Sequence, residues 1–329
     1  MQKKRMIPLN TVSEPTSIPS SLHVKPCRKL SRDSVLAILN KNVVAIPAFS
    51  ASALRLKDLL KEQNVDMATI TEIVKLDPGL TSQYLRAAQA TDVKAACKKT
   101  TSNIKEALLK AGMGEVRKQA TTIGVVDRVS NLRIKIDWSM YWLHSVLTAR
   151  LTERIAGAYR PITGKEYLAG LLHDSGKVFM EHFFPQEFES VVMYAMERGC
   201  GMLEAEKRLL EITHPEISAL LCEKWGLQRE IVRSIRFHHE PNSPFNKDPI
   251  DPDQEKLLAA CICVADILAN ICQANIPGAK IYDQPFETLP EYLFLKTFTA
   301  RTTLELDVAS ELEKAQKDIQ AAKLHVNGS

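Results

Sequence analysis

The sequence predicts an all-α protein, and three observations support this. After residue 30, apolar residues recur at three- and four-residue spacings almost throughout. The chain contains no convincing strand alternation and no internal repeat. With 329 residues, of which 45% are apolar, it is long enough for about two domains that each bury a core.

Short helices are expected between residues 31 and 129, and each interruption has a local cause. Residues 31–42 have the pattern of a capped helix, and Pro47 opens a second apolar stretch. Asp77-Pro78-Gly79 breaks the helical pattern of residues 67–90 into two helices. Gly112 and Gly114 separate two further helices.

A second helical block begins near residue 138, so we place a domain boundary near residues 128–138. Its expected helices cover residues 140–158, 165–184, 185–199, 201–213, 215–226 and 229–240. A proline-rich loop at 240–253 then precedes a long apolar helix at 255–273. These breaks define four parts, namely a leader (1–29), an N-terminal helical part (30–132), a second helical domain (133–275) and a C-terminal extension (276–329).

The C-terminal extension is expected to contain a loop at 275–290 and a final helix. That helix carries apolar residues at 4-3-4-3 spacing, namely Val308, Leu312, Ala315, Ile319 and Ala322. Because this seam covers only about two heptads, we expect it to pack against its own domain, with a homodimer contact as the alternative.

Positive charge is concentrated in the first 30 residues. Six basic residues oppose Glu14 there, so this segment carries +5 of a chain whose net charge is +4, which leaves −1 for the rest. We interpret the segment as a solvated, disordered leader. Because the remaining chain lacks a basic excess, nucleic acid is not expected as a partner.

Hydropathy and cysteine content favour a cytoplasmic protein. No run of about 18 apolar residues is present, so a membrane span is not expected. No apolar segment follows the basic N-terminus, which argues against a secretory signal. The seven cysteines are odd in number, scattered and without a CxxC pair, which is typical of reduced thiols.

Five histidines and two aspartates of the second block form the candidate site. They are His144, His173, Asp174, His214, His238, His239 and Asp266. Each lies on an expected helix or next to its end, and a helical bundle can bring such residues together in its core. Asp266 stands within an apolar helix, where a carboxylate is costly to bury unless it is paired or metal-bound. Each histidine taken singly also fits a hydrogen-bonded helix residue.

Taken together, the series predicts two divalent metal ions. Imidazoles and carboxylates suit Fe, Mn, Zn or Ni, and seven ligands exceed what one ion requires, with Asp174 placed to bridge. Two adjacent ions can activate water for phosphate-ester hydrolysis. Lys177, one turn after His173 on the same expected helix, could offer positive charge to a phosphate oxygen, unless it is a solvent-facing lysine in a salt bridge. Asp174 and Lys177 are therefore the predicted catalytic residues.

The order of several motifs adds a family resemblance. LLHDSGK, HPEI, HHEP and VADILAN resemble the HD-domain superfamily of metal-dependent phosphohydrolases. IPAFSASALRLKDLL, ITEIVKLDPGLTSQYLRAA, IKEALLKAGMGEVRKQA and EKWGLQREIVRSIRFHHEP narrow the resemblance to the HDOD family (HD-related output domain), over about residues 30–272. The resemblance implies an N-terminal helical bundle packed on an HD-like helical domain, and a role in bacterial signalling through protein partners.

The resemblance also implies how the ligands divide. His144, His173 and Asp266 would hold one ion, His214, His238 and His239 would hold the other, and Asp174 would be shared.

Two departures narrow the expected activity. The related HD-GYP phosphodiesterases of cyclic di-GMP carry a Gly-Tyr-Pro motif after the paired histidines, and residues 240–253 lack it, so cyclic di-GMP is not an expected substrate. Met140 stands where some of those enzymes use a glutamate for a third metal, so two ions at most are expected.

Two functions stay open. The first is a signalling module that binds metal but acts mainly through partners or oligomerisation. The alternative is an active phosphohydrolase that acts on a nucleotide or another phosphate ester.

Overall fold

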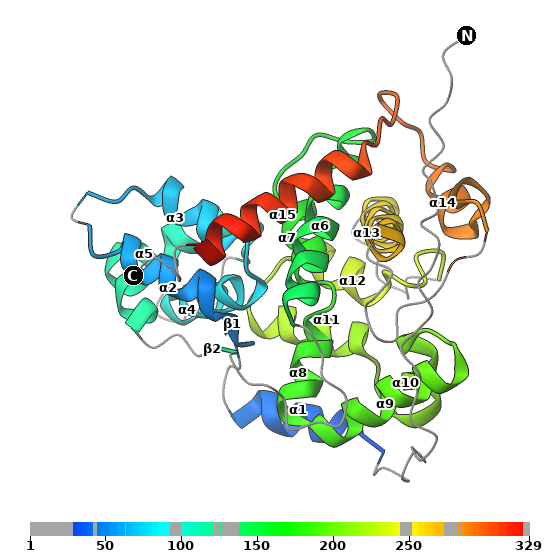
Figure 1. Ribbon diagram of the computed structural model, residues 1–329, viewed down its shortest axis with the longest axis horizontal. Coiled ribbons are helices and arrows are strands. Elements are labelled where there is room, and N and C mark those ends of the chain that lie inside the picture. The colour runs from blue at the N-terminus through cyan, green and yellow to red at the C-terminus, as the bar shows by residue number, and fades with distance from the viewer. Residues whose placement is uncertain are drawn as a thin grey trace.

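The computed structural model describes residues 29–41, 45–62, 64–92, 100–121, 125–126, 138–243, 252–272, 282 and 284–324. Within these residues the regular secondary structure is helical except for one pair of two-residue strands, which confirms the all-α class (Figure 1). Apart from Lys29, the expected leader lies outside the described residues, as do parts of the expected loops at 240–253 and 275–290.

The N-terminal bundle consists of short helices joined at the expected breaks. They are α2 (Ser50–Leu59), α3 (Met67–Val74), α4 (Pro78–Asp92) and α5 (Ile104–Thr121), whereas the preceding α1 (Arg32–Lys41) packs against the helix at His214–Lys224. α4 begins at Pro78 because the Asp77 carboxylate accepts hydrogen bonds from the backbone N–H groups of Gly79 (2.8 Å) and Leu80 (3.0 Å). α5 is interrupted at Gly112, whose φ of 75° only glycine adopts without strain.

Two short strands in this bundle were not expected. β1 (Ala48–Phe49) pairs in parallel with β2 (Val125–Val126). Strands of two residues are too short to show an alternating apolar pattern, so periodicity could not predict them.

The HD-like domain is built from the helices that follow residue 137. They are α6 (Trp138–Gly157), α7 (Lys165–Leu172), α8 (Ser175–Phe183), α9 (Pro185–Arg198), α10 (Met202–Leu209), α11 (His214–Lys224), α12 (Arg229–Arg236) and α13 (Pro252–Cys272). α7 and α13 both pack against α6, and α8 packs against α11.

One boundary prediction in this domain was wrong. A single helix was expected over residues 165–184, but the chain breaks between α7 and α8, where Asp174 has φ −100° and ψ 10°. The reason is tertiary, because α8 is redirected to pack against α11, and no proline marks the break. Lys177 therefore does not lie on the helix that carries His173.

The C-terminal extension contains one element that was not expected and one that was. A 3₁₀ turn at Phe286–Thr288 leads into α14 (Pro290–Leu295). The expected final helix is α15 (Val308–Leu324), which crosses α6 and α2 (Figure 1). Val308, Ala315 and Ile319 are buried, so the seam packs within the chain, whereas the side chain of Ala322 lies outside the described part.

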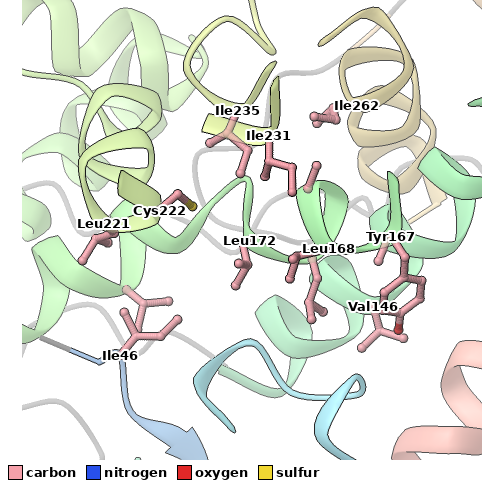
Figure 2. Close-up of a cluster of buried hydrophobic side chains, with 14 of the residues drawn as sticks. Ile46, Val146, Tyr167, Leu168, Leu172, Leu221, Cys222, Ile231, Ile235 and Ile262 are labelled. Atoms are coloured by element: carbon pink, nitrogen blue, oxygen red, sulfur yellow. The ribbon is translucent and has the colours of Figure 1, made fainter. Parts of the chain in front are cut away.

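The bundle packs on the HD-like domain, as the family resemblance implied. The ring of Phe49 stacks on Trp142, with centroids 4.8 Å apart and planes at 12°, and Trp142 Nε1 donates to the carbonyl of Leu76. Figure 2 shows how apolar side chains from both parts share one core; the labelled ones are Ile46, Val146, Tyr167, Leu168, Leu172, Leu221, Cys222, Ile231, Ile235 and Ile262.

Gly176 sets the close approach of α8 to α11. A Cβ atom at this position would lie 2.3 Å from the carbonyl oxygen of His214 and 3.0 Å from its Cα. These are backbone atoms, so a larger residue can be accommodated only if one helix moves.

Replacement of Gly176 tests this packing. We expect Gly176→Ala to lower the free energy of unfolding by about 1–3 kcal/mol, because α8 must shift away from α11. Urea denaturation measures the effect. The matched control is Gly114→Ala, where a Cβ meets nothing within 4 Å. It should raise stability by about 0.5–1 kcal/mol, since alanine favours a helix more than glycine does. Equal stability of the two variants would contradict the described approach.

Candidate metal centre

The structure brings all seven predicted ligands to one place in the HD-like domain. Their side-chain donor atoms form two groups, each within 4.8 Å. The first contains His144, His173, Asp174 and Asp266, and the second contains His214, His238 and His239. Six of the seven are buried and His239 is half-buried. Residues separated by up to 122 positions thus form one cluster, as expected for a helical bundle.

The first group is built where α6, α13 and the α7–α8 break meet. His144 faces the middle of α13, and its Nε2 lies 3.0 Å from Asp266 Oδ1. His173 ends α7 and Asp174 begins α8, so the break directs both side chains to the same centre. His173 Nε2 lies 3.4 Å from Asp174 Oδ2 and 3.6 Å from Asp266 Oδ1.

The second group is built from the first residue of α11 and the two residues after α12. Thr213 and Glu216 form a capping box that fixes the start of α11 and hence the position of His214. His214 Nε2 lies 3.1 Å from His239 Nε2.

Asp174 joins the two groups. Its Oδ2 faces His173 and lies 3.7 Å from His144 Nε2, whereas its Oδ1 lies 3.2 Å from His214 Nε2. Each carboxylate oxygen of Asp174 therefore faces a different group of donor atoms, which is the arrangement that a ligand bridging two metal ions requires.

Hydrogen bonds at Nδ1 fix the orientation of three imidazoles. His173 Nδ1–H donates to the carbonyl of Gly170 (2.8 Å), and His238 Nδ1–H donates to the carbonyl of Ile235 (2.6 Å). His214 Nδ1 pairs with Glu206 Oε2 at 2.7 Å. In all three rings Nε2 is consequently left to face the cluster, which is how metal-binding histidines are commonly held.

The donor set fits a transition-metal ion, and an unpaired buried nitrogen supports this independently of the family resemblance. His238 Nε2 is buried and has no hydrogen-bond partner among the described residues. An unpaired buried nitrogen is unfavourable, and coordination to a cation would compensate for it. Imidazole nitrogens combined with carboxylate oxygens are the ligands that Fe, Mn, Zn and Ni accept.

The two groups differ in charge. Burial alone would raise the pKa of Asp174, but His173 and Lys177 hold that pKa well below its ordinary value. Burial alone would lower the pKa of His173, yet Asp174 and Asp266 raise it to about 10. In the second group, burial and the neighbouring His214 lower the pKa of His239 to about 3. The first group therefore contains paired charges, whereas His239 is a neutral ligand at physiological pH.

Lys177 lies beside the cluster, but it is carried by a different helix from the one expected. It lies in the first turn of α8, and its Nζ donates to Asp174 Oδ2 at 2.6 Å. Its side chain is 20% exposed and lines the cavity at the site. Lys177 therefore lies beside Asp174, but the helix that supplies it is α8 and not the one that carries His173.

Two supporting residues were missed by the sequence analysis. Glu206 of α10 accepts from the backbone N–H of His214 (2.8 Å) as well as from its ring. Asn270 of α13 donates to Asp266 Oδ1 at 2.9 Å. The sequence offers a partial signal for Asn270, a polar residue one turn after Asp266 in an apolar helix, and none that distinguishes Glu206 from the other charged residues of α10.

None of the described helices combines the length and the apolar character that are needed to cross a membrane.

Comparisons with known proteins agree with this architecture. An uncharacterized protein of Treponema pallidum is 20% identical over 239 residues, which cover 72% of this chain and 44% of that protein, so the chain spans less than half of that relative. A virulence factor from Campylobacter jejuni has a similar structure, with a TM-score of 0.58 and 17% identity over 87% of this chain and 97% of that one. The MmoQ response regulator from Methylococcus capsulatus has a TM-score of 0.55 and 19% identity, over 74% and 96% of the two chains.

At these identities, the solved structures show a shared fold. The HDOD domain family model matches residues 46–241, more than half of the chain, and this span contains every candidate ligand except Asp266. The chain therefore belongs to the HDOD domain family.

Proposed function

We propose that the protein is a bacterial signalling protein whose HD-like domain holds two divalent metal ions, and that this site hydrolyses a phosphate ester. The observation that carries the proposal is the pair of donor groups joined by the two oxygens of Asp174. His144, His173 and Asp266 would hold one ion and His214, His238 and His239 the other, with Fe, Mn, Zn or Ni as the metal.

The bound ions would supply the hydrolytic chemistry, namely a water activated as a nucleophile and charge neutralisation at phosphate oxygens. The residues of the chain would bind, orient and shield the reactants. Glu206 holds His214 in position. Lys177, whose pKa is raised by Asp174 against the opposing effect of burial, stays protonated and offers positive charge to a phosphate oxygen.

A second function is favoured by a specific contact. Trp142, which stacks on Phe49 of the N-terminal bundle, lies two residues before His144 on α6. Movement of the bundle by a protein partner would therefore reach the metal site through one rigid helix. The MmoQ protein is described as a response regulator, which is consistent with such a role.

Metal content tests the proposal most directly. Elemental analysis of protein purified without chelator or an affinity metal should find about two ions per chain. Asp174→Asn should lose both ions, because it removes the shared ligand, whereas His238→Ala should lose one. His182→Ala, an exposed histidine on α8, is the control and should keep the full content. A parent protein that binds no transition metal under any loading condition would overturn the proposal.

Glu206 should act on metal affinity through His214. We expect Glu206→Gln to weaken the binding of one ion about 10- to 100-fold, because loss of the carboxylate reduces the basicity and fixed orientation of the imidazole. Calorimetric titration of the metal-free protein with Mn²⁺ measures this. Glu211→Gln, an exposed residue nearby, should bind as the parent does. An unchanged affinity in Glu206→Gln would show that the contact is structural only.

A variant of Lys177 tests catalysis separately from metal binding. We expect Lys177→Gln to keep both ions but to lower kcat about 100- to 1000-fold, since it removes a charge that stabilises the transition state. Release of inorganic phosphate from p-nitrophenyl phosphate gives the rate, and the exposed Lys207→Gln serves as the control. If the metal-loaded parent hydrolyses no ester, the hydrolase part of the proposal is wrong and the signalling part stands alone.

A further inference from the structure

The cavity beside the candidate metal centre has outer walls to which the proposed hydrolysis assigns no role. It has a volume of about 230 Å³, and its inner end is formed by candidate ligands and Lys177. Its outer walls come from α6, from the start of α10, from α13, from Tyr282 and from α14. These walls contact whatever organic group is attached to a phosphate held at the centre.

The size of the cavity favours a compact ligand. Pockets that enclose drug-sized molecules usually measure about 300–1,000 Å³. The volume of about 230 Å³ fits the phosphate group and the few non-hydrogen atoms of the organic part nearest to it, and a larger organic part would project from the mouth of the cavity. A cyclic dinucleotide carries two nucleosides, most of which would lie outside this space.

The charge of the outer wall favours a cation over an anion. Glu204 at the start of α10 and Glu291 on α14 both line the cavity. Glu204 is exposed and Glu291 is half-buried. Lys177 is the lysine that lines it in the described part of the chain, and its ammonium group is already paired with Asp174. Opposite charges attract and like charges repel, and both effects are stronger near a protein surface than in bulk water.

The remaining wall suits an ammonium group with short carbon substituents. Tyr141 is 7% exposed and lines the cavity together with Tyr282. Aromatic rings combined with carboxylates are the usual surroundings of bound alkylammonium ions. Buried Met202 and Ile267 provide apolar contacts for the carbon atoms.

We propose that this cavity selects compact phosphate monoesters whose organic part carries a positive charge, such as amino-alcohol phosphates, and disfavours esters with a second anionic group. The inference rests on the proposed hydrolase function and names its substrate class. In the reaction, an oxygen of water bonds to phosphorus and the ester P–O bond breaks. A proton from the water passes to the departing alcohol, so no oxidant or reductant is required.

Three esters of nearly equal size test the selection. Phosphoethanolamine is cationic at its organic end, 2-hydroxyethyl phosphate is neutral there, and phosphoglycolate is anionic. With the full metal-loaded chain, we expect kcat/KM for phosphate release to fall about threefold to tenfold at each step in that order. Cyclic di-GMP should not be hydrolysed.

A double variant tests whether the two glutamates cause the expected order of kcat/KM. Glu204→Gln combined with Glu291→Gln should bring the three values of kcat/KM to within about twofold of one another, because the electrostatic preference is lost. The matched control combines Glu197→Gln with Glu211→Gln, two exposed residues that do not line the cavity, and should keep the order.

A binding measurement distinguishes this inference from the proposed function. Isothermal titration of the metal-loaded parent with the three esters should give the same order of affinity, whether or not turnover occurs. Equal or reversed affinities, with p-nitrophenyl phosphate still hydrolysed, would overturn the selection and leave the hydrolase function intact. Ordered binding without hydrolysis of any ester would support the selection and contradict the hydrolase function.

Discussion

The site depends on one buried carboxylate whose two oxygens face different histidine groups. Asp174 can do this only because the chain breaks between α7 and α8. In a continuous helix, adjacent side chains point about 100° apart, so His173 and Asp174 would not converge on one centre. Gly176 then allows α8 to approach the start of α11, which brings His214 to 3.2 Å from Asp174. The break and the glycine therefore act together to create the link between the groups.

Holding this polar cluster inside the fold requires a rigid apolar frame. Burying carboxylates and imidazoles is unfavourable, so neighbouring elements must prevent the cluster from relaxing toward water. α6 has the central part in this frame, because α7, α13 and α15 all pack against it. α15 also contacts α2, and Arg150 of α6 pairs with Asp318 of α15. The N-terminal bundle and the C-terminal helix are thus mechanically connected to the helix that carries His144.

The sequence was sufficient for features that are encoded locally. Helical periodicity gave the fold class, and Asp77-Pro78 and Gly112 gave helix boundaries because proline and glycine act through their own backbone. The seven candidate ligands were found because they form a series of histidines and aspartates on successive expected helices and match motifs of a known family, and Asp266 also stands out as a carboxylate in an apolar helix. The break at His173–Asp174 could not be found, since its cause is the contact of α8 with a helix about 40 residues later. Glu206 and Asn270 were missed for a similar reason, because their role depends on which helix face meets the cluster.

The charges of the site connect its metal content to the kind of ligand it accepts. Two divalent ions and Lys177 would carry five positive charges, against three negative charges on Asp174, Asp266 and Glu206. The excess of two equals the charge of a phosphate monoester dianion, so such a ligand would leave the buried site neutral. A further anionic group would find no compensating cation and would meet Glu204 and Glu291 instead. The charge of the centre thus accounts for the phosphate group, and the acidic outer wall accounts for the preference among the organic groups attached to it.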